Sequence, residues 1–340
     1  MLGRQHDSRA EAGSRRHLPD APGAEDRARE RGRRPGRATG RGRQHSTGGR
    51  RRARVGDRGD RSVRLSHEGD GLRRPNTIGL LAKQTKLREN QLFVLPRDAP
   101  YSLRQWAAFS VRYLSAWANW RVAYGCWRVQ MPADLMPTPH VFAWGGGVAL
   151  AQLTLAKSFG CHVFMAASSD YRLQLIEQSG IVPIDRRQFP HLNFEAERYE
   201  TDRRYKRDYL ASESTFVGLI RSHTENLGAS IVIDNIGRPV FRASLRALAR
   251  QGVLATQGWK LGPDLTLNRA AECVNRHIHV STHASSFAEA VAGTHFALET
   301  GWLPRDVDDV YAWEDVSQLA CDVEHGRVRS YFPLFAVNPD

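Results

Sequence analysis

Short apolar runs alternate with longer segments of helical periodicity through the middle of the chain. The apolar runs cover residues 140–144, 161–167, 181–185, 230–237, 253–259 and 276–284. Apolar residues at helical spacing lie between them, over 148–159, 170–178 and 240–252 and in the charged segment 190–228. Strands that alternate with helices predict an α/β fold with a doubly wound parallel sheet and right-handed crossovers. A ligand would then lie along the carboxyl ends of the strands.

A further helix is expected ahead of this region, over residues 102–125. Its apolar residues recur at helical spacing, Ser102 can cap its start and Gly125 can end it. We expect Trp106 and Trp117 to be buried in the core. Upstream, residues 82–96 indicate one or two short strands with a turn at Glu89–Asn90.

The first 74 residues differ in composition from the rest. They contain 21 Arg, no Lys and 10 acidic residues, and they lack Phe, Tyr, Trp, Ile and Cys. Such a segment cannot bury enough apolar surface to offset chain entropy, so we expect a disordered Arg-rich tail over 1–74. An Arg/Gly-rich arm can bind nucleic-acid phosphates, but charge runs are usually solvated, so we assign no nucleic-acid partner. Arg without Lys is also typical of GC-rich DNA translated in an unselected frame.

Bulk properties favour a cytoplasmic protein. No window of about 18 apolar residues predicts a membrane span, and the N-terminus has no apolar core typical of a secretory signal. The cysteines are few and far apart, so they indicate neither a zinc knuckle nor a disulfide framework. They are Cys126, Cys161, Cys273 and Cys321.

Three consecutive glycines follow the first strand of the central region. Gly145, Gly146 and Gly147 lie between the strand 140–144 and the helix that begins near Val148. A helix N-terminus at the carboxyl end of a strand offers N–H groups and partial positive charge to a phosphate. Trp144 stands where the dinucleotide-binding pattern has its first glycine. Two interpretations therefore remain: a pyrophosphate site, or a glycine-rich connection that binds no ligand.

The residues after the second strand bear on the choice of cofactor. NAD is usually held there by an acidic residue, whereas this chain has Ser168 and Ser169 followed by Arg172. Hydroxyl and guanidinium groups suit a 2′-phosphate, so we expect NADP(H). Either serine could instead only cap the helix 170–178.

Three histidines, His277, His279 and His283, lie in the last expected strand. Strand alternation would place them on one face, which permits a metal. No cysteine or carboxylate is firmly placed beside them, so we assign no metal. Asp185 with Arg186 and Arg187 is interpreted as a structural ion pair at a strand end.

The order of several segments resembles the medium-chain dehydrogenase/reductase superfamily, and within it the crotonyl-CoA carboxylase/reductase branch. The segments are AKQTKLRENQLF, SVRYLSAWANW, AWGGGVALAQLTLAKSFG with SSDYR, SIVIDNIG and HVSTHASSFAEA, within about Thr77 to Pro339. The resemblance implies a Rossmann domain, NADPH, and hydride transfer to an α,β-unsaturated acyl thioester, with CO₂ added in carboxylating members. It also implies a GroES-like lobe, most of which would precede residue 76, where the Arg-rich tail stands.

The resemblance assigns roles to particular positions. Gly145, Gly146, Gly147 and Val148 would meet the pyrophosphate, and Ser168, Ser169 and Arg172 the 2′-phosphate. Asn235, Ile236, Gly237, Gly258 and Trp259 would lie near the nicotinamide, and His283 would be the catalytic residue.

The resemblance also divides the chain. It implies a remnant of the catalytic lobe with a connecting helix over 75–130, a Rossmann domain over 131–285, and C-terminal helices and a strand returning to the lobe over 286–340. We expect a homodimer that pairs through about 276–284. The alternatives are a zinc-free quinone or alcohol dehydrogenase relative, and a truncated dinucleotide-binding fragment without catalytic competence.

Overall fold

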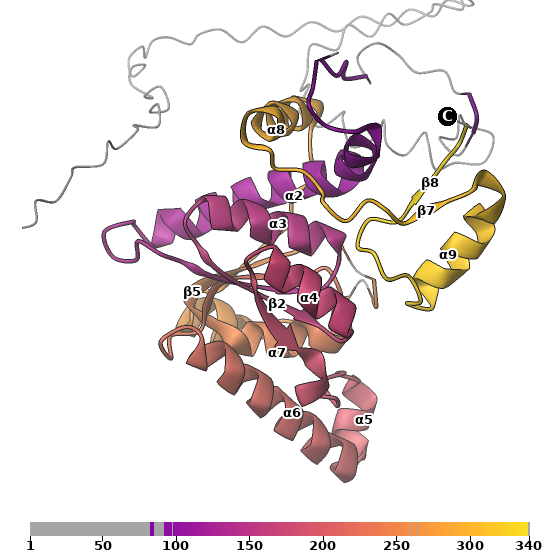
Figure 1. The fold of residues 1–340 in the computed structure, drawn as a ribbon. Helices are drawn as coiled ribbons and strands as arrows, with labels where there is room; N and C mark the ends of the chain where they lie inside the picture. The colour runs from indigo at the N-terminus through magenta and orange to yellow at the C-terminus, as the bar shows by residue number, and fades with distance from the viewer. Residues whose placement is uncertain (1–81, 85–91, 97, 259, 263, 339–340) are drawn as a thin grey trace, which may run out of the picture. The chain divides into compact units, whose positions relative to one another are not determined.

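The computed structural model describes residues 82–84, 92–96, 98–258, 260–262 and 264–338. Within them, six parallel strands form one sheet in the order β3-β2-β1-β4-β5-β6 (Figure 1). The strands are β1 (His140–Trp144), β2 (His162–Ala167), β3 (Val182–Asp185), β4 (Ala229–Ile233), β5 (Leu248–Ala255) and β6 (His279–Ser281). The chain therefore has the expected doubly wound Rossmann sheet, in which the strand order reverses between β1 and β4.

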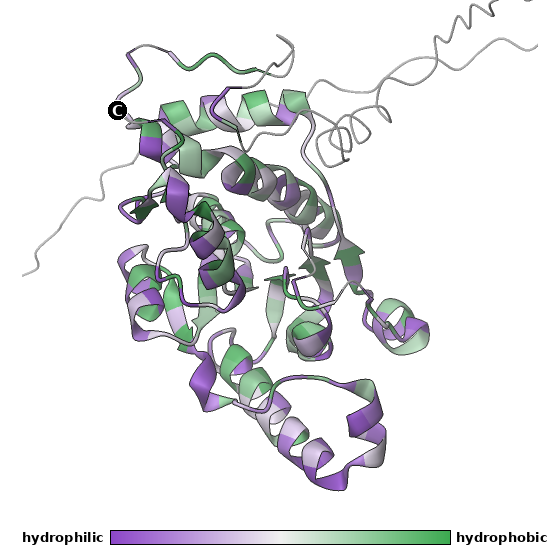
Figure 2. Cartoon of the chain, turned by 90° about the vertical axis from the view of Figure 1, so that its right-hand side faces the viewer, coloured by the Kyte–Doolittle hydropathy of each residue, from purple (hydrophilic) through white to green (hydrophobic). Residues whose placement is uncertain are grey.

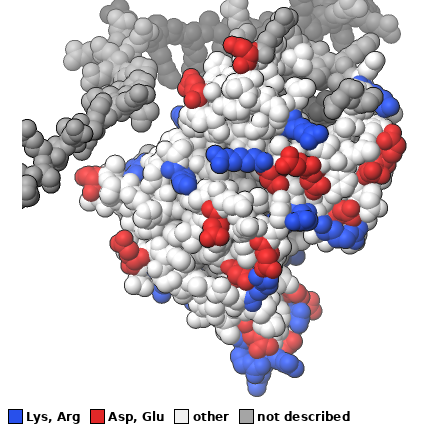
Figure 3. All heavy atoms as spheres, in the orientation of Figure 1, with Lys and Arg blue, Asp and Glu red and all other residues white. Residues whose placement is uncertain are grey.

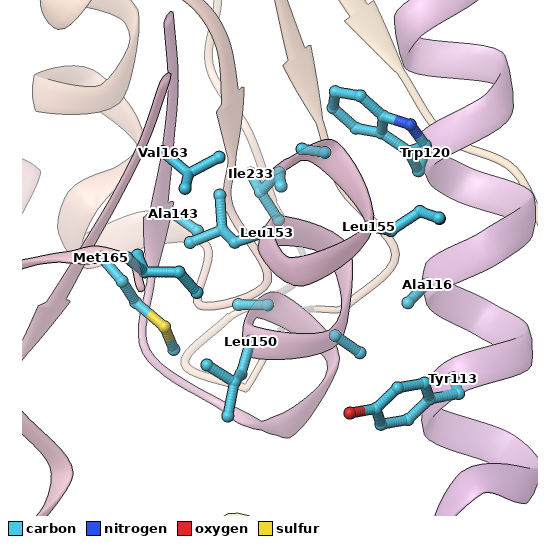
Figure 4. Packing of buried hydrophobic residues seen from close by; sticks show 14 of the residues in the cluster. Tyr113, Ala116, Trp120, Ala143, Leu150, Leu153, Leu155, Val163, Met165 and Ile233 are labelled. Carbon is cyan, nitrogen blue, oxygen red and sulfur yellow. The ribbon is translucent and has the colours of Figure 1, made fainter. Parts of the chain in front are cut away.

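One face of the sheet is covered by α2 (Leu103–Gln130), α3 (Gly147–Ser158) and α4 (Asp170–Gln178). α8 (Phe287–Thr300) packs on α2, where its Phe296 contacts Trp117. Figure 4 shows how side chains from α2, α3 and the strands meet on this face of the sheet, with Trp120 and Ala116 facing Leu155. Val141 and Ala143 point to this side, whereas Phe142 and Trp144 point to the other. Alternate side chains of β1 thus pack into two separate apolar layers, one on each face of the sheet.

The opposite face is covered by α6 (Arg203–Ser222) and α7 (Arg238–Ala247), with the short α5 (Ala196–Thr201) beside α6. Tyr209, Phe216 and Ile220 of α6 are buried against the sheet. The outer side of α5 and α6 is hydrophilic in Figure 2. This confirms that the charged segment 190–228 forms helices that cover the sheet with a solvated outer face.

Helix α2 is longer than the sequence predicts. Ser102 caps it through a capping box with Gln105, and Trp106 and Trp117 are buried, as expected. Gly125 does not end the helix, which continues to Gln130. A Cβ added at Gly125 would meet nothing within 4 Å, so this glycine sits in an ordinary helical position and acts as no stop signal.

The boundary between α7 and β5 also differs from the prediction. The expected helix 240–252 ends at Ala247, and β5 begins at the next residue rather than at Val253. The cause is a contact across the sheet: Leu248 pairs with Ala229 of β4. This pairing extends β5 into residues whose sequence pattern is helical. The last strand is likewise shorter than 276–284, because His277 has a positive φ of 54°.

The C-terminal part contains β7 (Val310–Tyr311), α9 (Val316–Glu324) and β8 (Leu334–Phe335), with a short 3₁₀ turn, η4 (Trp313–Asp315), before α9. β7 and β8 pair in parallel as a separate two-stranded sheet. The expected turn at Glu89–Asn90 and the tail 1–74 lie outside the described residues.

No helix among the described residues is long and apolar enough to cross a membrane. On the face that Figure 3 shows, basic and acidic side chains of the described residues are interspersed. The excess positive charge of the sequence is concentrated before residue 75.

Candidate functional site

A cleft of about 490 Å³ opens at the carboxyl ends of β1, β2 and β4, where the strand order reverses. Its walls come from the glycine turn, the end of β2, the start of the 3₁₀ turn η2 (Arg186–Gln188), the loops after β4 and β5, and the segment 323–333. Nucleotides bind at this position in open α/β sheets, so the fold itself marks the cleft as the candidate site.

The glycine turn has a conformation that other residues would strain. Gly146 caps α3 with a φ of 138°, outside the range of L side chains. A Cβ on Gly147 would lie 2.7 Å from the backbone oxygen of Tyr331, so this glycine lets the C-terminal segment approach α3 closely. The N-terminus of α3 therefore faces the cleft with backbone N–H groups.

Trp144 does not block the turn. Its ring is almost fully buried on the α6 and α7 side of the sheet, where it packs against Phe216 with centroids 4.7 Å apart. Its Nε1 donates to Ser244 Oγ at 2.7 Å. Only the edge of the residue borders the cleft, so the bulky side chain and the glycine turn are compatible.

Asp234, directly after β4, organises the loop that follows. One carboxylate oxygen accepts from the backbone N–H groups of Ile236 and Gly237, at 2.9 and 3.0 Å. The other accepts from Ser244 Oγ at 3.2 Å. Burial raises the pKa of this carboxyl above its ordinary value, and these hydrogen bonds offset part of the shift. Asp234 therefore fixes the start of this loop and ties it to α7.

Four basic side chains line the cleft without an ion pair to another described residue: Arg112, Arg172, Arg186 and Lys260. Burial lowers the pKa of both Arg112 and Arg186. Each guanidinium rests near an aromatic ring, that of Arg112 over Phe332 and that of Arg186 over Trp144, both at 5.7 Å. Partly buried cations without a carboxylate partner suit an anionic ligand.

The ion pair predicted at the end of β3 forms between Asp185 and Arg187 but does not include Arg186. Arg187 pairs with Asp185 at 2.8 Å and with Asp170 at 2.6 Å. Arg186 takes no part and faces the cleft instead. The sequence reasoning missed Arg186, although its position directly after a parallel strand was a usable signal. It also missed Arg112 and Lys260, because nothing in the sequence locates α2 or the loop after β5 beside the glycine turn.

The serines and the arginine after β2 have separate surroundings. Ser168 lines the cleft, whereas Ser169 caps α4 by accepting from the Arg172 backbone N–H at 3.4 Å. The Arg172 guanidinium donates to the carbonyls of Val328 and Arg329, at 2.8 and 3.3 Å, and lies over the Tyr331 ring. Ser169 is therefore a helix cap, and Ser168 borders the cleft.

The cleft brings together about half of the predicted site residues. Gly145, Gly146, Gly147, Ser168, Arg172 and Ile236 line it. Val148, Ser169, Asn235, Gly237, Gly258 and His283 do not line it. Trp259 lies outside the described residues.

Asn235, Gly258 and His283 form a second group, at the ends of β4, β5 and β6. Asn235 Oδ1 accepts from the Gln257 backbone N–H at 2.9 Å, and the Gln257 side chain donates to the His283 carbonyl. A Cβ on Gly258 would lie 3.0 Å from the Asn235 carbonyl, so this loop needs glycine for close packing. Gln257 is a connecting residue that the sequence reasoning did not single out.

Alternation along a strand predicted that His277, His279 and His283 share one face. They do not. β6 covers only His279–Ser281, with His277 in a left-handed conformation before it and His283 beyond its end. A carboxylate does lie beside His283, contrary to the expectation: Glu289 Oε1 is 2.7 Å from its Nε2. Among the described residues, no cluster of three or more His, Cys, Asp or Glu side chains could hold a metal ion.

Solved structures share this fold. The crotonyl-CoA carboxylase/reductase AntE in complex with NADP is 20% identical, covers 69% of this chain and 57% of its own, and has a TM-score of 0.56. The alcohol dehydrogenase of Aeropyrum pernix is 18% identical over 69% of this chain and 59% of its own, with a TM-score of 0.52. A quinone oxidoreductase of Pseudomonas syringae pv. Tomato DC3000 is 16% identical over 76% and 72%, with a TM-score of 0.54.

These likenesses show that the described chain shares the fold of these three solved structures. The chain spans 57% of the length of AntE and 59% of that of the archaeal alcohol dehydrogenase. No family model matches the sequence, and no curated protein matches it.

Proposed function

We propose that the chain is an NADPH-dependent oxidoreductase that acts on an α,β-unsaturated acyl thioester. The observation that carries the proposal is the cleft at the strand-order reversal, lined by the glycine turn and by basic side chains without a described ion-pair partner. The pyrophosphate of NADPH would suit the N-terminus of α3. The surrounding positive charge would suit both the pyrophosphate and the 2′-phosphate. A bound nucleotide would compensate the charges of Arg112 and Arg186, which are partly buried.

The chain's residues would hold the nucleotide in three places. The backbone of Gly145, Gly146, Gly147 and Val148 would meet the pyrophosphate, with Arg112 and Lys260 adding positive charge. Ser168, Ser169 and Arg172 would meet the 2′-phosphate, assisted by Arg186. The carbonyls of Val328 and Arg329 engage two of the five N–H groups of the Arg172 guanidinium, which leaves others for the phosphate.

The nicotinamide end would lie over the loops that follow β4 and β5. Asn235, Ile236, Gly237, Gly258 and Trp259 belong to these loops, and Asp234 fixes the first of them through backbone hydrogen bonds. Asn235 Nδ2 and Gln257 Oε1 are buried and have no hydrogen-bond partner among the described residues. A donor and an acceptor of this kind complement a carboxamide. When bound, the cofactor would supply the hydride, and His283 would exchange a proton with the substrate.

The direct test is NADPH oxidation by the full-length chain with crotonyl-CoA, with and without bicarbonate. We expect consumption of NADPH that depends on the acyl thioester. Mass analysis of the product distinguishes a saturated thioester from a carboxylated one. Loss of turnover in His283→Asn, with NADPH binding retained, would support the catalytic assignment.

The second candidate is a zinc-free quinone or alcohol dehydrogenase relative, which the solved structures with the same fold favour equally. Turnover with a quinone or an alcohol but not with an enoyl-CoA would establish it. A folded chain that binds no dinucleotide would instead identify a fragment without catalytic competence.

We also propose that the chain forms a homodimer through the sheet edge at β6. Val280 on this terminal strand is 41% exposed, and an exposed edge can pair with a second copy. Val280→Lys should convert the dimer to monomer in sedimentation velocity, whereas Val111→Lys on the exposed side of α2 should not. A wild-type chain that sediments only as monomer at all concentrations contradicts the proposal.

A further inference from the structure

His283 is held at two points by groups from different elements. Its backbone carbonyl accepts a hydrogen bond from the Gln257 side chain at the end of β5. Its ring nitrogen Nε2 lies 2.7 Å from Oε1 of Glu289 in the first turn of α8. The residue is outside regular structure, so these two contacts fix its backbone and its ring where β6 no longer does.

Glu289 is itself oriented by the start of α8. Its second oxygen, Oε2, accepts from the backbone N–H and the hydroxyl of Ser286, both at 2.8 Å. Ser286 Oγ accepts in turn from the Glu289 backbone N–H, which completes a capping box. Burial alone would raise the pKa of Glu289, but the bonds from Ser286 and His283 outweigh it and lower the pKa below its ordinary value. The carboxylate is therefore ionised and directed at the imidazole.

The chemistry of this pair determines the tautomer of His283. An ionised carboxylate only accepts hydrogen bonds, so Nε2 must carry the proton in the neutral ring as well as in the imidazolium. No hydrogen bond joins Nδ1 to another described residue, and about a third of the side chain is exposed. The ring thus has a single nitrogen available to a substrate.

We propose that Glu289 is a positioning residue that holds Nε2 of His283 and presents Nδ1 as the atom that exchanges protons with substrate. This rests on the proposed function. In the reductive direction, the imidazolium gives its Nδ1 proton to the substrate and becomes neutral, while Nε2–H stays on Glu289, and solvent then returns the proton to Nδ1. A neutral His283 could accept a hydrogen bond at Nδ1 but could not donate one, so protonating the substrate requires the imidazolium.

The charged group that faces the ring from α8 is Glu289, and the contact from the end of β5 is the neutral Gln257. The carboxylate stabilises the imidazolium, so removing its charge should favour the neutral ring. Glu289→Gln is the informative variant, because glutamine also completes a capping box and keeps the start of α8.

The test is two-dimensional ¹H–¹⁵N NMR of the histidine rings in the full-length chain, without nucleotide, across pH. The wild type should show a neutral His283 ring protonated at Nε2. In Glu289→Gln the carboxamide can donate as well as accept a hydrogen bond, so the tautomer protonated at Nδ1 should appear beside the one protonated at Nε2. Glu299→Gln, on the exposed side of the same helix, is the matched control and should shift nothing.

A neutral wild-type ring protonated at Nδ1, or a tautomer population unchanged by Glu289→Gln, overturns the inference. These measurements need no bound cofactor, so they separate failure of the positioning role from failure of the proposed reaction. If NADPH-dependent turnover is present, kcat should fall in Glu289→Gln and stay unchanged in Glu299→Gln, because the ring of His283 is then no longer held with Nδ1 available to the substrate. Unchanged turnover beside a changed tautomer population also overturns the inference, because His283 would then not be the group that exchanges the proton.

Discussion

Arg186 and Arg112 illustrate how single residues give the cleft its character. Both guanidinium groups are partly buried beside aromatic rings, and neither forms an ion pair with another described residue. Burying a cation costs free energy unless a negative group compensates it. The neighbouring Arg187 shows the opposite arrangement, since it is exposed and pairs with two aspartates.

This contrast gives a matched pair of variants. We expect Arg186→Ala to weaken NADPH binding by roughly ten- to a hundred-fold, because a charge-assisted hydrogen bond contributes on the order of 1.5–3 kcal/mol. Arg187→Ala should leave the affinity within about two-fold, because its guanidinium is engaged outside the cleft and screened by solvent. Isothermal titration calorimetry with both variants measures the difference, and equal losses would contradict the assignment of Arg186.

At this scale the sequence predicted backbone roles better than side-chain directions. Gly146 needs a positive φ, and the triple glycine announces such a turn. The direction of Trp144 depends on the alternation of β1, which sends its ring to the α6 and α7 side. The partner of His283 is Glu289, six residues on, and only the turn into α8 brings them together.

Among the elements, α2 contributes most to the layer above the sheet. Trp120 on this helix is fully buried and stacks on Tyr124 with centroids 5.2 Å apart. The same helix exposes Val129 to solvent. Its aromatic residues are therefore core residues, as their helical spacing predicts.

We expect Trp120→Ala to lower the free energy of unfolding by about 3–5 kcal/mol, the usual cost of emptying a buried tryptophan site. Val129→Ala should change it by less than about 0.5 kcal/mol, because that side chain is 86% exposed. Urea denaturation followed by tryptophan fluorescence and by circular dichroism measures both. Similar stability of the two variants would mean that α2 does not pack as described.

Element boundaries were less predictable than element types. The first strand, 140–144, was predicted with its observed bounds, because an apolar run between proline and glycine defines its own limits. The end of α7 was not, because pairing between Leu248 and Ala229 extends β5 into a segment of helical pattern. Local periodicity carries no information about such a pairing across the sheet.

For the whole described chain, the parallel doubly wound sheet follows from the alternation of elements, but the position of the C-terminal segment does not. Residues 328–332 lie against the glycine turn, where the Tyr331 carbonyl approaches Gly147 and two carbonyls hold Arg172. Both Arg172 and the glycine turn were predicted from the sequence as site residues. Nothing in the sequence shows that residues 328–332 border them. These contacts make the C-terminal segment one wall of the cleft.

The proposed function depends on whether this cleft binds NADPH. The most direct measurement is a fluorescence titration of the full-length chain with NADPH and with NADH, repeated with Arg172→Ala. We predict saturable binding of NADPH that is tighter than that of NADH, and we expect Arg172→Ala to remove most of this preference while leaving NADH binding little changed. Failure of a folded chain to bind either nucleotide would contradict the account.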